Sequence, residues 1–347
     1  MTKSNPGRFL EDFALGQTIA HAAPRTLTQG DVALNIALTG SRHALFSADT
    51  FAQSCGLPRA PIDPLLAFHI VFGKSVPDIS LNAVANLGYA EGRFLAPVYP
   101  GDTLRAQSEV IGLKQNSNGK TGILTVRTAG LNQHGACVLS YVRWVMVNKR
   151  EPGAPAPESV SPPLAEAVAP NQLVLPPGLD FSRYNWTLAG SPHAFEDYAI
   201  GEKIDHVDGV TVEEAEHQLA TRLYQNNARA HFDAHAQGAS RFGKRLIYGG
   251  VAISLARSLA FNGLANAGLM LAINAGRHVN PLFAGDTLYA WSEVLDKADV
   301  GVSGALRLRL VATKNRPCAD FPLKLANGAY DSAVALDFDY WAAVPKR

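Results

Sequence analysis

The sequence predicts an α+β protein built from two copies of one domain, each an antiparallel sheet wrapped around an apolar helix. Residues 92–110 read GRFLAPVYPGDTLRAQSEV, residues 276–294 read GRHVNPLFAGDTLYAWSEV, and eleven of these nineteen positions are identical. A second similar pair, at 9–21 and 195–206, has nearly the same separation. Self-similarity at a fixed separation is the sequence signature of a repeated structural unit. The chain is therefore a tandem duplication.

The segment between the two copies is rich in proline. Residues 151–170 read EPGAPAPESVSPPLAEAVAP and contain six prolines. Proline lacks the backbone donor and favours extended chain, so this stretch indicates a linker or a surface strap. We expect an N-terminal domain over 1–150, a linker over 151–190 and a C-terminal domain over 191–347.

Each copy begins with a short strand, a polar helix and then an apolar helix. In the second copy Thr211-Val-Glu-Glu214 is a capping-box pattern and predicts the start of the polar helix. The apolar helix begins at Asp63-Pro64 in the first copy, where Asp is a favourable N-cap and Pro a favourable first residue. In the second copy it begins near Gly249-Gly250 and runs to about Leu264.

Alternating strands follow the apolar helix in both copies. Asn118-Gly119 is a hairpin signal between two of them. A helix that is apolar on all sides must be covered on all sides, and several antiparallel strands can cover it. This arrangement is the hotdog fold, here in tandem. The clearest strands are expected over 103–110, 140–147, 287–294 and 332–340.

Composition narrows the classes of partner. The 347 residues carry 31 Lys and Arg against 30 Asp and Glu, a net charge of +1, which disfavours nucleic acid and anionic membranes as partners. No run of about 18 apolar residues predicts a membrane span, and the N-terminal region lacks the apolar core of a signal peptide. Three cysteines without a CxxC pattern favour reduced thiols. We expect a cytoplasmic protein.

Several stretches resemble a known enzyme family. Residues 226–233 (NNARAHFD), followed by Tyr248-Gly-Gly250 and Gly285-Asp-Thr-Leu288, resemble the MaoC-like, (R)-specific enoyl-CoA hydratases, which are hotdog proteins. Residues 71–93 and 139–149 look like the mesaconyl-CoA hydratases, also called β-methylmalyl-CoA dehydratases. The resemblance implies reversible syn hydration of mesaconyl-C1-CoA (2-methylfumaryl-CoA) to β-methylmalyl-CoA in glyoxylate assimilation. It implies an acyl-CoA substrate and no cofactor.

The family motif Asp-x-Asn-x-x-His places the histidine at His231. Its aspartate position is Asn226, or Gln225 if a one-residue shift lets Asn227 fill the asparagine position, so an amide replaces the carboxylate. Histidine is the candidate base because its ordinary pKa of about 6.5 suits proton transfer near neutral pH. The amides of Gln225, Asn226 and Asn227 are expected to orient a water molecule.

The start of the second apolar helix is the candidate oxyanion and substrate site. Amide groups at Gly249-Gly250, with the positive end of the helix dipole, would stabilise an enolate-like oxygen, and Tyr248 directly precedes them. Without a gap, His231 aligns with Leu45, and Gly249-Gly250 with Asp63-Pro64. The first half is therefore the degenerate half.

A mesaconyl group carries a free carboxylate that requires a cation. The candidates for this carboxylate and for the CoA phosphates are Arg229, Lys244, Arg245 and, more weakly, Arg277.

Two other functions compete with hydration. A hotdog acyl-CoA thioesterase often carries a carboxylate on its apolar helix, but residues 250–264 contain none, and Asp63 is the nearest analogue. A non-catalytic acyl-CoA-binding module would explain the missing aspartate. His231 and His235 stand four residues apart without an HExxH pattern, so no metal site is expected. We also expect a homo-oligomer.

Overall fold

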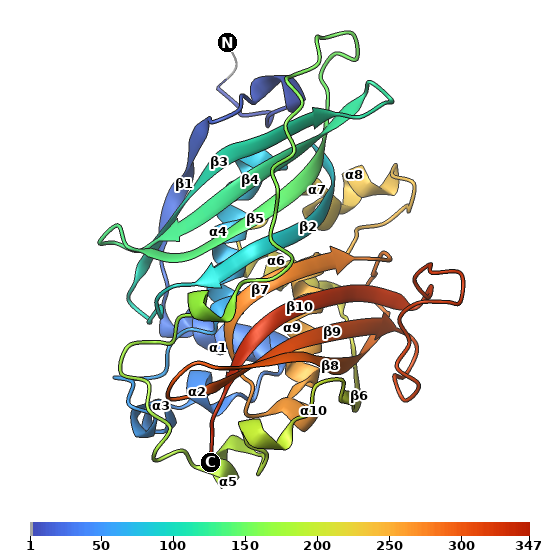
Figure 1. Cartoon of the computed structure of the whole chain (residues 1–347). Coiled ribbons are helices and arrows are strands. Elements are labelled where there is room, and N and C mark those ends of the chain that lie inside the picture. The colour runs from blue at the N-terminus through green and yellow to red at the C-terminus, as the bar shows by residue number, and fades with distance from the viewer. Residues whose placement is uncertain (1–2) are drawn as a thin grey trace.

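The two copies share one sheet. The structure is a computed structural model that describes residues 3–347. Its ten strands lie in the order β1-β3-β4-β5-β2-β7-β10-β9-β8-β6, so both copies have the same internal order outward from the centre (Figure 1). They join where β2 pairs antiparallel with β7, at Tyr89↔Gly276 and Arg93↔Ala272. The predicted double hotdog is confirmed.

The elements of the first copy are bounded as follows. Its strands are β1 (Thr18–Thr26), β2 (Ala83–Phe94), β3 (Thr103–Gln115), β4 (Thr121–Leu131) and β5 (Cys137–Asn148). Its helices are the 3-10 turn η1 (Leu10–Asp12), α1 (Gln29–Thr39), α2 (Ala44–Ser47), α3 (Asp49–Ser54) and α4 (Pro64–Ile79).

The second copy repeats this order after the short elements η2 (Pro170–Gln172), α5 (Trp186–Ala189) and η3 (Phe195–Asp197). Its strands are β6 (Lys203–Thr211), β7 (Leu269–His278), β8 (Thr287–Asp299), β9 (Gly304–Lys314) and β10 (Val334–Val344). Its helices are α6 (Glu214–Leu223), α7 (Arg229–Phe232), α8 (Ala234–Gly238), α9 (Gly249–Leu259) and α10 (Phe261–Leu264).

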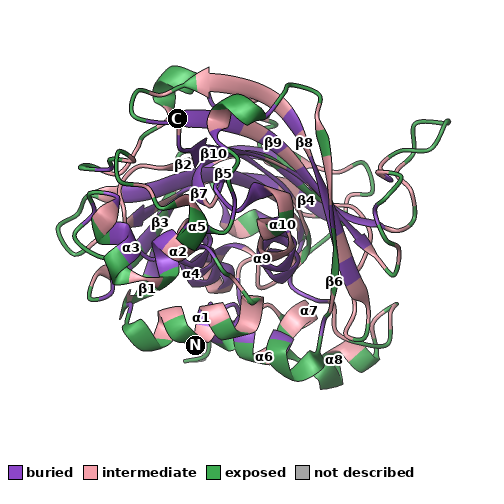
Figure 2. Cartoon of the chain, turned by 90° about the horizontal axis from the view of Figure 1, so that it is seen from below, coloured by how far each residue is buried: buried purple, intermediate pink, exposed green. Residues whose placement is uncertain are grey.

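The apolar helices α4 and α9 are the centres of the two copies. Helix α4 begins as predicted, because the Asp63 carboxylate accepts a hydrogen bond from the Leu65 amide at 2.8 Å and Pro64 fills the first turn. Both helices lie beneath the concave face of the sheet, and α1 and α6 form an outer layer below them (Figure 2). Each central helix is therefore covered on all sides, as its composition requires.

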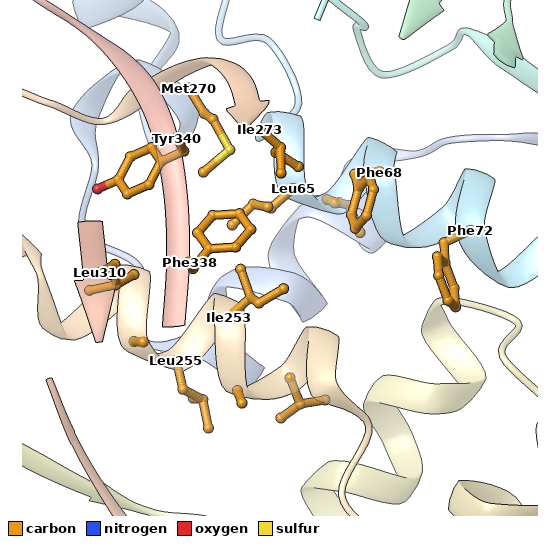
Figure 3. Packing of buried hydrophobic residues seen from close by; sticks show 14 of the residues in the cluster. Leu65, Phe68, Phe72, Ile253, Leu255, Met270, Ile273, Leu310, Phe338 and Tyr340 are labelled. Atoms are coloured by element: carbon orange, nitrogen blue, oxygen red, sulfur yellow. The ribbon is translucent and has the colours of Figure 1, made fainter. Parts of the chain in front are cut away.

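One hydrophobic core spans the junction of the copies. Figure 3 shows Phe68 of α4 and Ile253 of α9 approaching the same cluster from opposite sides, where they meet Ile273 and Phe338 of the sheet. All four side chains are at most 1% exposed. Burial of each such side chain contributes about 1.5–3 kcal/mol, so the copies stabilise one another through a shared core.

The repeated motif residues have the same structural role in both copies. His21 Nε2 and Ser108 Oγ are 2.8 Å apart, and His206 Nε2 and Ser292 Oγ are separated by the same distance. Both histidines are therefore part of the packing of their own copy. Retention of this pair in both copies reflects a requirement of the fold.

Three local expectations need correction. Helix α6 begins at Glu214 with Glu213 as its N-cap, while Thr211 ends β6 and its hydroxyl bonds the Thr287 hydroxyl, so the predicted capping box is wrong. The apolar helix of the second copy is interrupted, because residues 262 and 263 are not helical. Equivalent helices of the two copies start 185 residues apart, which aligns His231 with Phe46, rather than Leu45, and Gly249 with Pro64. The first copy still lacks the histidine and the glycine pair.

The proline-rich segment crosses the outer face of the sheet (Figure 1). Val160 pairs with Leu113 of β3. Farther along, the Val168 carbonyl accepts a hydrogen bond from Trp341 Nε1 at 3.0 Å. The segment thus bonds to strands of both copies. None of the helices within residues 3–347 combines the length and apolar character needed to cross a membrane.

Candidate active site

His231 lies on the one-turn helix α7 with its ring fixed in orientation. Its Nδ1 lies 3.0 Å from the Leu246 carbonyl oxygen, and a carbonyl can only accept, so Nδ1 carries the proton. The other ring nitrogen, Nε2, is then the basic atom. Burial lowers the pKa of His231 below its ordinary value, against the raising effect of the Leu246 bond. The imidazole is therefore neutral at pH 7 and able to accept a proton.

The start of α9 lies beside this ring. Tyr248 is the N-cap residue of α9, and its ring centroid is 5.5 Å from that of His231. The leading amides of Gly249 and Gly250 lack intrahelical acceptors because they lie in the first turn, and the N-cap side chain does not bond to them. Their N–H groups and the helix dipole make this end a favourable position for negative charge.

Both glycines are required by crowding at the helix start. A Cβ atom on Gly249 would lie 2.2 Å from the His278 ring. A Cβ on Gly250 would lie 2.3 Å from the Tyr248 ring and 2.7 Å from His69. Glycine is the residue type that lets these rings approach the backbone so closely.

Sequence reasoning missed a group of aromatic rings near His231, called here the aromatic shell, which consists of His217, Tyr248, His278 and Tyr89. The Tyr248 amide donates to His217 Nε2 at 2.9 Å, and the ring centroids of His217 and His231 are 6.3 Å apart. His278 Nε2 lies 3.2 Å from the Tyr89 hydroxyl, which comes from the first copy. Burial lowers the pKa of His217 to about 3 and that of His278 to about 4, so both rings are neutral.

A difference between the copies could have revealed this shell. In the repeated motif, His278 of the second copy stands where the first copy has Phe94. Both copies share the histidines that the fold requires, as His21 and His206 show. A histidine present in one copy alone, next to the glycine pair, marks a position that the fold does not need.

The three amide side chains separate in the structure. Gln225 follows α6 in a left-handed conformation with a φ of +56°, which is uncommon for a residue other than glycine. Asn226 is 1% exposed, and its side-chain oxygen accepts from the Ala228 amide at 3.1 Å. Asn227 is exposed and, with Gln225, lines a cavity. The oxygen of Asn226 is thus used within its own loop.

One of the four predicted cations has an acidic partner, and the other three are exposed. Arg245 forms an ion pair with Glu214 at 2.7 Å, which compensates its charge. Lys244 is exposed and lies over the Phe283 ring at 4.2 Å. Arg229 is exposed and reaches Asn82 of the first copy at 3.4 Å, and Arg277 is exposed on β7.

Asp233, next to these residues, has a local role. Its carboxylate accepts a hydrogen bond from the Ala236 amide at 2.9 Å and so caps α8. Asp233 therefore fixes local structure. Among residues 3–347, no cluster of three or more metal-binding side chains is present.

Comparison with known proteins gives a consistent result. The family model described as mesaconyl-CoA hydratase matches residues 2–318. The chain is 62% identical over 348 residues to beta-methylmalyl-CoA dehydratase of Chloroflexus aurantiacus, covering 99% of both chains. It is 64% identical to mesaconyl-CoA hydratase of Cereibacter sphaeroides, covering 99% of this chain and 100% of that one.

Solved structures support the same relationship. A MaoC domain protein of Chloroflexus aurantiacus superposes with a TM-score of 0.98 at 62% identity, and both chains are covered completely. A double hotdog protein of Mycobacterium tuberculosis gives a TM-score of 0.75 at 25% identity, with 97% of this chain and 98% of that one covered. From its full-length similarity and its shared architecture, the chain belongs to the mesaconyl-CoA hydratase family of MaoC-like double hotdog proteins.

Proposed function

We propose that this protein is a hydro-lyase that reversibly hydrates mesaconyl-C1-CoA (2-methylfumaryl-CoA) to β-methylmalyl-CoA. The observation that carries the proposal is a neutral histidine, fixed through Nδ1, beside the uncapped N-terminus of α9. Relatives at 62–64% identity over the full chain bear the names of this activity.

The proposed chemistry assigns the proton transfer to His231. A water molecule at Nε2 gives up a proton to that nitrogen as its oxygen bonds to the β-carbon of the enoyl thioester. The π electrons move toward the thioester oxygen, where the amides of Gly249 and Gly250 stabilise the developing charge. The imidazolium then returns its proton to the α-carbon from the same face, which gives syn addition and restores neutral His231.

The aromatic shell supports this cycle. Because His217 and His278 are neutral, they do not repel the positive charge that His231 acquires when it takes up a proton. The lowered pKa of His231 keeps the base unprotonated between turnovers. The same low proton affinity favours return of the proton to the substrate.

The test is the ultraviolet absorbance of mesaconyl-C1-CoA mixed with the protein and a chromogenic thiol reagent. Hydration removes the conjugated enoyl-thioester band and releases no thiol. Thiol release would instead identify a thioesterase. Binding with neither change, and with crotonyl-CoA equally inert, would identify a binding module and refute the proposal.

A further inference from the structure

Lys74, on the degenerate first half, is a buried cation with only neutral partners. The residue is 3% exposed and lies on the third turn of α4. Its ammonium donates to the Ala23 carbonyl and to the side-chain oxygen of Gln225, the latter at 3.3 Å. Within residues 3–347 it has no ion pair with a carboxylate. An ammonium removed from water without a counter-charge is unfavourable, so this position would gain from an anion.

The electrostatics of Lys74 agree with an uncompensated charge. Burial and, to a smaller extent, the charge of nearby Arg25 together lower the pKa of Lys74 to about 8. Arg25 itself is paired with Asp31. At pH 7 the ammonium is still mostly protonated, and a bound anion would stabilise that form.

Lys74 lies on the wall of a cavity that also contacts the active half. The cavity has a volume of about 340 Å³, within the roughly 300–1,000 Å³ of small-molecule sites. Its described lining includes two cations and no carboxylate. The lining residues are Ala22, Ala23, Gly73, Lys74, Pro77, Thr221, Arg222, Gln225, Asn227 and Phe232.

The cavity adjoins the segment that carries His231. Gln225 and Asn227 belong to the loop between α6 and α7, and Phe232 directly follows His231. Helix α4 contacts this loop so closely that a Cβ on Gly73 would lie 1.9 Å from the Tyr224 carbonyl oxygen. The cation of the first half and the base of the second half are therefore joined through one loop.

The two halves divide these groups between them. Helices α4 and α9 start at Pro64 and Gly249, so Lys74 corresponds to Leu259. The cation is present in the first half alone, and the histidine of α7 in the second half alone. Packing common to both halves does not explain either residue.

We propose that Lys74 is a specificity-determining residue whose ammonium binds the free carboxylate of the acyl group. The inference rests on the proposed function for the identity of that acyl group. In mesaconyl-C1-CoA the carboxylate is attached to the carbon that receives water, so its anchor also orients that carbon.

The affinities for two saturated thioesters separate the contribution of the carboxylate from that of the CoA part. Succinyl-CoA and butyryl-CoA have four-carbon acyl groups, and succinyl-CoA carries a carboxylate where butyryl-CoA has a methyl group. Calorimetric titration should show that the unmodified protein prefers succinyl-CoA. Lys74→Met should weaken the binding of succinyl-CoA about 10- to 100-fold, which is the range for loss of a hydrogen bond to a charged group. The affinity for butyryl-CoA should change less than about threefold.

Lys149 is the matched control. It is 6% exposed, and its ammonium also bonds a glutamine side chain, Gln115 at 2.8 Å, and a backbone carbonyl, Ala154 at 2.7 Å. It directly follows β5 and does not line the cavity. Lys149→Met should leave the affinities for both thioesters unchanged. Lys74→Arg, which keeps the charge, should retain a preference for succinyl-CoA.

The outcomes distinguish this inference from the proposed function. If Lys74→Met loses affinity equally for both thioesters, Lys74 acts on the CoA part or on folding, and the inference is overturned. If the variant loses no affinity for succinyl-CoA, the inference is also overturned. Should the methionine variant fail to fold, Lys74→Gln gives the same comparison. Hydration of mesaconyl-C1-CoA by the unmodified protein is measured separately, so failure of that reaction refutes the proposed function alone.

Discussion

Gly73→Ala tests whether the first half positions the loop of the second. Gly73 lies inside α4, where alanine is favoured over glycine by about 1 kcal/mol. The new Cβ, however, would lie 1.9 Å from the Tyr224 carbonyl oxygen, whereas ordinary contacts begin at 3.4 Å. Overpacking of this kind costs about 1–3 kcal/mol, and the Tyr224 carbonyl cannot avoid the new Cβ by a side-chain rotation because it is part of the backbone. Set against the helix preference of about 1 kcal/mol, this cost should lower the free energy of unfolding by up to about 2 kcal/mol.

The same displacement should reach the site. Tyr224 and Gln225 lead into the loop before His231, and misplacement of reacting groups by about 1 Å lowers rates up to about 100-fold. Urea unfolding followed by circular dichroism and the rate of mesaconyl-C1-CoA hydration are the two measurements. Gly238→Ala is the control, because a Cβ at Gly238 in α8 meets nothing within 4 Å and should not lower stability. Equal or higher stability of Gly73→Ala with full activity would refute the reasoning.

Three further predictions follow from the site. The kcat/KM for hydration should rise with pH through a pKa below 6.5 and be level near pH 7, because His231 must be neutral; a rising limb above pH 7 would contradict this. Gly249→Ala should displace the His278 ring and lower kcat about tenfold or more, and a crystal structure with an unmoved ring would count against it. The thermal midpoint should be highest above pH 6.5 and fall toward pH 5, because the unfolded chain protonates histidines that burial keeps neutral in the folded protein. Each such histidine lowers the free energy of unfolding by about 1.4 kcal/mol per pH unit in this range. A midpoint that stays constant from pH 7 to pH 5 would contradict the assignment of these histidines as neutral. These histidines are His43, His69, His206, His217 and His278, with pKa values lowered to about 3 or 4.

The sequence contained most of the information on the fold. The duplicated GDTL motif predicted two equivalent copies, and the apolar stretches predicted their central helices. The start of α4 at Asp63-Pro64 follows local chemistry and was predicted correctly. The start of α6 was not, because Thr211 is the last residue of β6 and bonds across the sheet to Thr287. Tertiary pairing there overrides a local pattern.

The site was less accessible to sequence reasoning. The motif located His231 and the glycine pair, but the basic residues nearest to it in sequence were poor candidates for a carboxylate. Arg245 is neutralised by Glu214, and this pairing depends on how α6 packs. Lys74 lies 157 residues before His231 in the chain, and packing between the copies brings it to the loop that precedes His231. Oligomeric state and cellular location stay predictions.

The most direct test of the account compares the unmodified protein with His231→Gln on mesaconyl-C1-CoA. Glutamine keeps a polar side chain of similar reach and cannot take up a proton near neutral pH. The account predicts loss of the enoyl-thioester band without thiol release for the unmodified protein, and a rate lower by about 100- to 10,000-fold for the variant at unchanged stability. A variant that hydrates the substrate at nearly the original rate would show that another group is the base.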